Sequence, residues 1–225
     1  MEDRKDEWGV DSPVYQSKVL GDFPDEDPWQ IISLGLCEAA VLREIEPTHK
    51  KELGVDVARF GDDNTVLAIK DGDIITELIV ISGRDTVQVS RQIMALHNTH
   101  NFLRIKVDEI GVGAGVVDTL KAAGLPVIGV NVARKSNNEL YKNLRTELWF
   151  NGRDWLKYGK IPDDDRLKSE LTAPRYDYTP DGKYMVEKKD ETKKRIGRSP
   201  DIADAVLLAI YNPAPVAQSE LYIIG

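Results

Sequence analysis

The sequence predicts an α/β fold built on a mixed sheet, in which three antiparallel strands are followed by parallel strands, with helices on both faces and an added β-hairpin. Three observations predict it. Apolar segments of strand length follow one another closely over residues 53–81. Strand and helix patterns then alternate over residues 85–130. Near the end, an alternating segment at 175–187 is broken by Pro-Asp-Gly, which is typical of a hairpin.

Size and composition indicate one sizeable folded unit. The chain has 225 residues, 41% of them hydrophobic and 30% charged, so it can bury roughly 70% of its surface and is not a disordered chain. No apolar run approaches the ~18 residues that span a bilayer, and no signal-peptide pattern opens the chain. The single cysteine, Cys37, excludes a disulfide framework and a cysteine-based zinc site. We therefore expect a location in a reducing cytoplasm, with no membrane partner.

The chain divides into three parts in this interpretation. Residues 1–48 are acidic and interrupted by four prolines, which predicts a lead-in or linker packed on the main domain, with one short helix within 30–46. Residues 49–213 form the main domain, and residues 214–225 a C-terminal tail.

The first half of the main domain is predicted to contain five strands and two helices. Asp71-Gly72-Asp73 predicts a hairpin between the second and third strands, and Asp85 or Thr86 can cap the first helix. Gly124 suits the left-handed position that ends the second helix. The expected strands are 53–58, 65–69, 74–81, 104–108 and 126–130, with a turn at 61–64. The first helix follows its cap and carries Val89, Ile93 and Leu96 on one face, and the second spans 113–123.

The second half is predicted to be mainly helical. Leucines spaced four residues apart predict a long helix over 138–158, and a short helix follows Pro162 over 163–172. The hairpin at 175–187 comes next. The last helix is predicted over 200–211, with Pro200 in its first turn and Ser199 as its cap.

Four carboxylates occupy positions that need an explanation. Asp56 lies inside an apolar strand, where a charge is costly unless it is paired or bound to a cation. Asp108 ends the fourth strand, and Asp201 and Asp204 share one face of the first turns of the last helix. If these acids converge, their mutual repulsion favours a hard divalent cation, and oxygen ligands without His or Cys select Mg²⁺ or Mn²⁺. Two such ions about 3.5–4 Å apart can hydrolyse a phosphodiester.

The charge distribution suggests a partner. The net charge is −8, yet residues 131–160 and residues 183–198 each hold seven bases and three acids. Such stretches are either solvated faces or contacts to a phosphate backbone. The candidate DNA contacts lead into the last helix: Lys188, Lys189, Lys193, Lys194, Arg195 and Arg198.

Several motifs together resemble the nuclease domain of the large terminase subunit of tailed bacteriophages, over most of residues 17–211. The main ones are GVD at 54–56, VDEIGVG at 107–113 and SPDIADA at 199–205. KVLGDFP at 18–24 resembles the segment that precedes that domain, and NLRTELW at 143–149 its middle helix. Each motif is short, and it is their order and spacing that carry the resemblance.

The resemblance implies a ribonuclease H-like fold and a two-metal endonuclease that cuts double-stranded viral DNA during genome packaging, leaving 3′-OH and 5′-phosphate ends. It implies that Asp56, Asp108 and Asp204 hold two Mg²⁺ or Mn²⁺ ions, with Asp201 beside them as a ligand or helper. Large terminases also carry an ATPase motor, but no G-x-x-x-x-G-K-[ST] occurs here. We therefore expect the isolated C-terminal domain, whose full-length protein would work with an ATPase domain, the small terminase and the portal in the host cytoplasm.

Other functions stay open at this stage. A Holliday-junction-type resolvase would share the fold and chemistry, and a non-catalytic module could bind DNA or the portal through the same basic stretches. A nucleotide binder of the actin or sugar-kinase type is disfavoured, because no second glycine-rich phosphate loop is present. Gly111-Val112-Gly113 is better explained by close backbone approach beside Asp108 than by dinucleotide binding, since Val116 replaces the third glycine.

Overall fold

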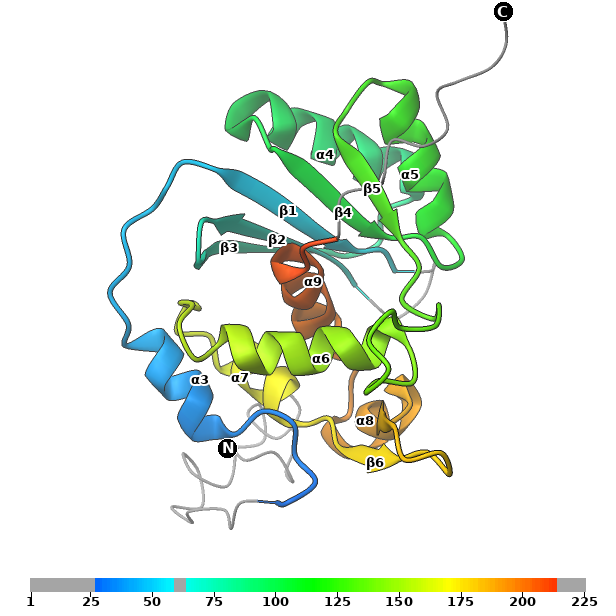
Figure 1. Ribbon diagram of the computed structural model, residues 1–225. Coiled ribbons are helices and arrows are strands. Elements are labelled where there is room, and N and C mark those ends of the chain that lie inside the picture. The colour runs from blue at the N-terminus through cyan, green and yellow to red at the C-terminus, as the bar shows by residue number, and fades with distance from the viewer. Residues whose placement is uncertain (1–26, 59–63, 214–225) are drawn as a thin grey trace, which may run out of the picture.

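Five strands form one mixed sheet in the computed structural model, which describes residues 27–58 and 64–213 (Figure 1). The strand order is β3-β2-β1-β4-β5. The β3–β2 and β2–β1 pairs are antiparallel and the β1–β4 and β4–β5 pairs are parallel, which confirms the predicted fold class. The strands are β1 (Lys51–Asp56), β2 (Thr65–Asp71), β3 (Ile74–Ile81), β4 (Arg104–Asp108) and β5 (Val127–Val130).

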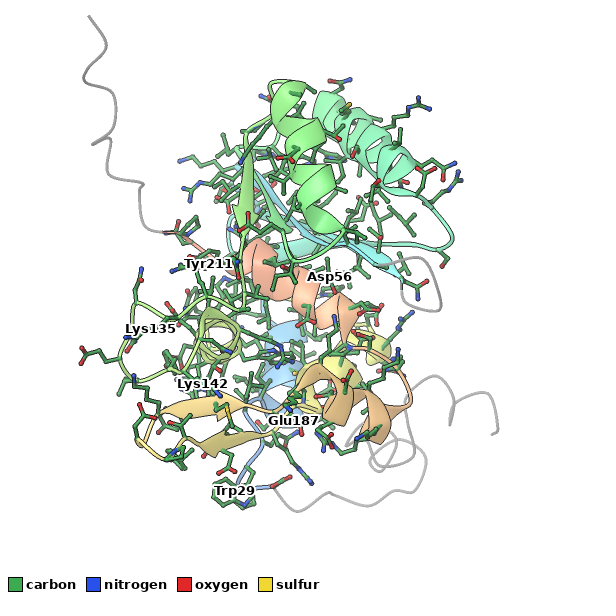
Figure 2. The ribbon with its side chains drawn as sticks, turned by 90° about the vertical axis from the view of Figure 1, so that its right-hand side faces the viewer. Trp29, Asp56, Lys135, Lys142, Glu187 and Tyr211 are labelled. Carbon is green, nitrogen blue, oxygen red and sulfur yellow. The ribbon has the colours of Figure 1, made fainter. Side chains whose placement is uncertain are left out.

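Strand periodicity divides the sheet into two faces, each with its own hydrophobic core. Leu53 and Val55 of β1 pack with helices α4 (Thr86–His100) and α5 (Gly113–Ala122). On the other face lies α9 (Asp201–Ile210), which packs on β1 and β2. Behind it lie α3 (Leu34–Val41), α6 (Leu144–Trp155) and α7 (Asp165–Thr172), as the two views show (Figures 1 and 2). Because successive side chains of a strand point to opposite faces, Gly54 and Asp56 belong to the α9 face.

Close packing of α9 on the sheet depends on a glycine. Gly54 pairs with Ala68 of β2 and with Lys106 of β4, so it lies in the middle of the sheet under α9. A Cβ atom at position 54 would lie 2.1 Å from the carbonyl oxygen of Ala205 and 2.3 Å from the backbone nitrogen of Ala209. No side chain fits there, so the glycine sets how near α9 approaches β1.

The helices behind α9 complete this core. They are α3 (Leu34–Val41), α6 (Leu144–Trp155) and α7 (Asp165–Thr172), and α8 (Lys189–Ile196) precedes α9 along the chain. Cys37 of α3 and Trp149 of α6 are fully buried in the same cluster as α9. The end of the predicted lead-in therefore packs on the main domain, and its boundary at residue 48 stays a prediction.

The predicted helix at 138–158 is too long at its N-terminal end. It begins at Leu144, because the side chain of Asn143 accepts hydrogen bonds from the backbone N–H and the hydroxyl of Thr146. Before it, the side-chain oxygen of Asn138 accepts from the backbone N–H of Leu140, which fixes a turn. The side chain of Asn143 thus caps the start of α6 within a segment where the leucine spacing predicted a continuous helix.

Two features near the C-terminus differ from the sequence prediction. The helix α8 was not predicted, although Gly197 with φ of +76° ends it in the left-handed conformation that suits glycine. Ser199 does not cap the last helix: the N-cap position is Pro200, and no side chain near it in the chain makes a cap hydrogen bond. The first turn of α9 is instead satisfied by a residue of α7, described below.

The hairpin is confirmed as a separate two-stranded sheet of β6 (Tyr176–Tyr178) and β7 (Tyr184–Val186). It packs on α6 through Phe150, whose ring lies 5.5 Å from that of Tyr176 and 4.8 Å from that of Tyr184. No helix in the described part of the chain is long and apolar enough to cross a membrane. The predicted turn at 61–64 (apart from Asn64), the 18–24 motif and the 214–225 tail lie outside the described residues.

Candidate active site

The sheet register explains why two distant acids lie near each other. Val55 of β1 pairs with Val107 of the parallel strand β4. Asp56 and Asp108 each follow that pair by one residue, at the same edge of adjacent strands. Parallel strands carry functional side chains at their carboxyl ends, and both aspartates belong to the face that α9 covers. The N-terminal turns of α9 bring Asp201 and Asp204 to the same edge.

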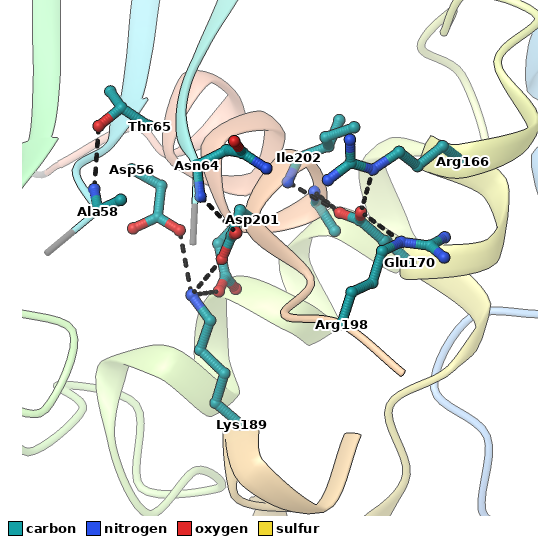
Figure 3. Close-up of polar contacts among 12 residues, drawn as sticks. Asp56, Ala58, Asn64, Thr65, Arg166, Glu170, Lys189, Arg198, Asp201 and Ile202 are labelled. Atoms are coloured by element: carbon teal, nitrogen blue, oxygen red, sulfur yellow. Dashed lines mark hydrogen bonds and ion pairs between the residues drawn. The ribbon is translucent and has the colours of Figure 1, made fainter. Parts of the chain in front are cut away.

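Three of the four predicted carboxylates converge on one ammonium group (Figure 3). The Nζ atom of Lys189, the first residue of α8, lies 3.1 Å from Asp56, 3.1 Å from Asp201 and 2.8 Å from Asp204. Asp56 and Asp201 are 8% and 4% exposed. The structure therefore gathers acids from β1 and α9 around one positive charge.

The charges in this cluster do not balance. Burial opposes the charged form of Lys189, but the carboxylates of Asp204, Asp56 and Asp201 outweigh it and raise the pKa of that ammonium group. One ammonium cannot neutralise three carboxylates. Burial, with repulsion from Asp204 and Asp201, therefore raises the pKa of Asp56 to about 7. The cluster has room for more positive charge than Lys189 supplies.

Asp108 lines a cavity of about 550 Å³, and Lys189 and Asp204 of the acidic cluster line the same cavity. Burial raises the pKa of Asp108 to about 6, although the backbone N–H of Ile110 donates a hydrogen bond of 3.0 Å to the carboxylate. Asp108 and Asp204 both line the cavity, and Leu148 and Leu207 are among its apolar lining residues. Carboxylates thus face an open volume next to the cluster around Lys189.

The raised pKa values predict a pH-dependent stability. A carboxyl group whose folded-state pKa exceeds its unfolded value stabilises the fold below about pH 4, and this contribution is lost as pH rises through the folded pKa. For Asp108 the loss falls between about pH 4 and pH 6 and is at most about 3 kcal/mol, since each pKa unit corresponds to about 1.4 kcal/mol. In EDTA, Asp108→Asn should therefore gain thermal stability relative to the parent between pH 4.5 and pH 7.5.

Thermal unfolding of both proteins across that range measures the effect. Asp118→Asn, at an exposed site on α5, is the matched control and should show no such trend. A difference between Asp108→Asn and the parent that stays constant with pH would contradict the argument.

The predicted DNA contacts separate into two groups in the structure. Lys188 and Lys189 line the cavity, and Lys194 pairs with Glu191 with its side chain 71% exposed. Arg195 pairs with Glu187, and Arg198, only 15% exposed, pairs with Glu170. Lys193 also has a partner of its own. Of the six basic residues, Lys188 and Lys189 line the cavity together with Asp108 and Asp204.

Two basic residues that were not among the predicted DNA contacts also line the cavity. Lys142 precedes α6 and Arg145 lies in its first turn, and both line the cavity with Lys188. Figure 2 shows Lys142 close to the hairpin. These residues belong to the basic stretch 131–160, so the two stretches meet at one place. The charge count found both stretches, but only the fold shows which members face the acids.

The glycine motif after β4 has a packing role. Gly111 has φ of +69°, and a Cβ atom on Gly113 would lie 1.8 Å from the carbonyl oxygen of Asp108. The start of α5 thus rests against the backbone of Asp108. This contact agrees with the predicted close backbone approach beside Asp108.

Solved structures define the class of fold. The chain shares its architecture with nuclease domains of phage large terminase subunits, so the sequence resemblance is confirmed at the level of fold. No protein-family model and no curated protein matches the chain.

The nuclease domain of the large terminase subunit gp2 of bacterial virus Sf6 superposes with a TM-score of 0.68 at 18% identity, covering 82% of this chain and 99% of that one. A lysine-to-alanine mutant of that domain, with manganese and β-thujaplicinol, gives 0.71 at 17% identity, with coverages of 82% and 99%. The large terminase nuclease of thermophilic phage G20c with bound magnesium gives 0.63 at 21%, covering 83% and 98%. These identities establish the shared fold.

Proposed function

We propose that this chain is a metal-dependent endonuclease that hydrolyses double-stranded DNA during phage genome packaging, as the nuclease domain of a large terminase. The observation that carries the proposal is the convergence of Asp56, Asp201 and Asp204 on a single cationic atom, with Asp108 facing the adjoining cavity. Solved phage terminase nuclease domains with this fold hold manganese or magnesium.

The donor set fits Mg²⁺ or Mn²⁺. All four side chains offer carboxylate oxygens, which hard divalent cations prefer, and neither His nor Cys is among them. As the side chains stand in the described part of the chain, no three His, Cys, Asp or Glu residues are close enough to hold a metal. The acids contact the Lys189 ammonium at 2.8–3.1 Å instead, whereas Mg²⁺ needs oxygens at about 2.0–2.1 Å. Loading therefore requires the carboxylates to close in as the ammonium withdraws.

The protein's own groups have distinct roles in this proposal. Asp56, Asp108 and Asp204, with Asp201 beside them, would hold two divalent ions, which supply an activated water and neutralise the leaving oxygen. The cations lining the cavity, Lys142, Arg145 and Lys188, are placed to pair with phosphates of the DNA strand. Such contacts read no base, so cleavage should be nearly independent of sequence and weakened by salt.

The wider setting follows from the same proposal. In a full-length terminase this domain would act with an ATPase domain, the small terminase and the portal, in the host cytoplasm. Residues 1–48 would connect it to the motor.

Plasmid cleavage tests the proposal directly. Supercoiled plasmid is incubated with the protein in Mg²⁺, in Mn²⁺ and in EDTA. We expect nicked and then linear DNA with either metal, no cleavage in EDTA, and less cleavage as salt rises. The ends should carry 3′-hydroxyl and 5′-phosphate groups, as ligation and end-labelling can show.

Two results would overturn it. Retarded DNA bands without cleavage in any metal would indicate a docking module. Cleavage of a four-way junction in strong preference to duplex DNA would indicate a resolvase.

A further inference from the structure

A fully buried carboxylate outside the proposed metal ligands contacts the helix that carries two of them. Glu170 of α7 is 0% exposed. Its Oε2 atom accepts hydrogen bonds from the backbone N–H groups of Ile202, at 2.8 Å, and Ala203, at 3.2 Å. These two residues lie between Asp201 and Asp204 in the first turn of α9 (Figure 3). The carboxylate therefore contacts the backbone segment that the two acids flank.

This contact replaces a cap that the helix lacks. The first N–H groups of a helix have no partner within it and are usually satisfied by a side chain at the N-cap. The N-cap of α9 is Pro200, and no neighbouring side chain makes a cap hydrogen bond. A carboxylate near a helix N-terminus also interacts favourably with the helix dipole. Glu170 supplies both effects from another helix.

The second oxygen of Glu170 fixes the carboxylate itself. Oε1 accepts from Nε of Arg166, at 3.1 Å, one turn earlier on α7, and from Nε of Arg198, at 3.2 Å, just before α9. A buried carboxylate needs such partners, because an unpaired one would be costly. The network joins α7, the segment before α9 and the first turn of α9.

The opposite end of α9 is held by a buried cation. Lys106 of β4 is 0% exposed, and its Nζ atom donates to the carbonyl oxygens of Ala209, at 2.6 Å, and Tyr211, at 2.7 Å. Glu52 of β1 accepts from the same atom at 2.6 Å. With its C-terminus tied to the sheet, the position of the first turn depends on the contact with Glu170.

We propose that Glu170 is a positioning residue of the nuclease site: by capping α9 from α7, it places Asp201 and Asp204 beside Asp56. The inference rests on the proposed function. Glu170 touches neither metal nor DNA in this proposal. It acts on the relative placement of the carboxylates, and therefore on metal affinity and turnover, while DNA binding through the cavity cations is unaffected.

Glu170→Gln tests the inference, with the exposed Glu77 of β3 as matched control through Glu77→Gln. The amide keeps the shape of the side chain but offers only one acceptor oxygen and no charge. We expect kcat for plasmid nicking to fall at least about 10-fold, KM for DNA to stay within about 2-fold, and Mn²⁺ affinity, measured by calorimetry without DNA, to weaken about 10-fold. Glu77→Gln should match the parent in all three. A loss of folding stability alone would not produce this split at a temperature well below unfolding.

The outcomes separate this inference from the proposed function. If the parent does not cleave DNA in any metal, the proposed function is wrong and the inference falls with it. If the parent cleaves and folded Glu170→Gln has parental kcat and Mn²⁺ affinity, only the inference is wrong. Should Glu170→Gln not fold, Glu170→Asp takes its place. Its shorter side chain cannot reach both N–H groups with α9 in place, so parental kcat in that folded variant would overturn the inference.

Discussion

Asp56→Asn is expected to remove metal-dependent DNA cleavage, lowering its rate by about 10³-fold or more, while the protein stays folded. Asp56 is 8% exposed and shares the Lys189 ammonium with Asp201 and Asp204. A neutral amide oxygen binds a divalent cation far more weakly than a carboxylate, so an essential ligand is lost. A 10³-fold effect corresponds to about 4 kcal/mol of transition-state stabilisation, which is reasonable for metal-assisted hydrolysis.

The thermal stability of Asp56→Asn without metal should not fall together with its cleavage rate. Because burial raises the pKa of Asp56 to about 7, the fold disfavours its charged form in the absence of metal. The neutral Asn should therefore leave thermal stability in EDTA at pH 7.5 at least equal to that of the parent. Nicking assays and thermal unfolding are made on the same preparations. Asp154→Asn, at an exposed pair with Lys157, is the control and should retain parental cleavage.

Cleavage by folded Asp56→Asn within about 10-fold of the parent would show that this carboxylate is not a metal ligand. A large loss of stability in EDTA would instead show that Asp56 serves mainly as the partner of Lys189.

Gly54→Ala should cause a large loss of folding stability. The new Cβ atom would lie 2.1 Å from the carbonyl oxygen of Ala205 and 2.3 Å from the backbone nitrogen of Ala209. Neither is a flexible side chain, so α9 must move away from β1. We expect a loss of about 3 kcal/mol or more in the free energy of unfolding. Whatever remains folded should cleave poorly, because α9 carries Asp201 and Asp204.

Chemical denaturation of purified protein measures this effect. Gly35→Ala is the matched control, since no atom lies within 4 Å of its added Cβ in α3 and alanine favours a helix by about 0.5–1 kcal/mol. It should be neutral or stabilising. A Gly54→Ala protein as stable as the parent would contradict the close contact between α9 and the sheet.

The sheet and the four aspartates could be predicted because their signals are local. Apolar segments of strand length, separated by turn signals, define β1 to β3. An acid inside an apolar strand, as at Asp56, is unusual on its own. The alternation of strands and helices predicts parallel strands, but the pairing of β1 with β4 comes from the structure. The placement of Asp108 beside Asp56 needs only that pairing.

The features that sequence could not supply all depend on contacts between distant segments. Glu170 caps a helix that begins 31 positions later, so the local search for a cap chose Ser199 instead. The role of Lys189 depends on which side of α8 faces the acids. The segment of α8 consists mainly of charged residues, so its sequence has too few apolar positions to predict a helix. Lys142 is exposed and ordinary in sequence until the fold places it in the cavity with Asp108.

The central claim is that the acids at 56, 108, 201 and 204 form one cation site, and anomalous scattering from a crystal grown with Mn²⁺ tests it most directly. We expect a manganese peak bound by Asp56 and by at least two of the other three aspartates, with the Lys189 ammonium displaced from them. A crystal in which Lys189 keeps its contacts to the carboxylates and no manganese lies among them would contradict the claim.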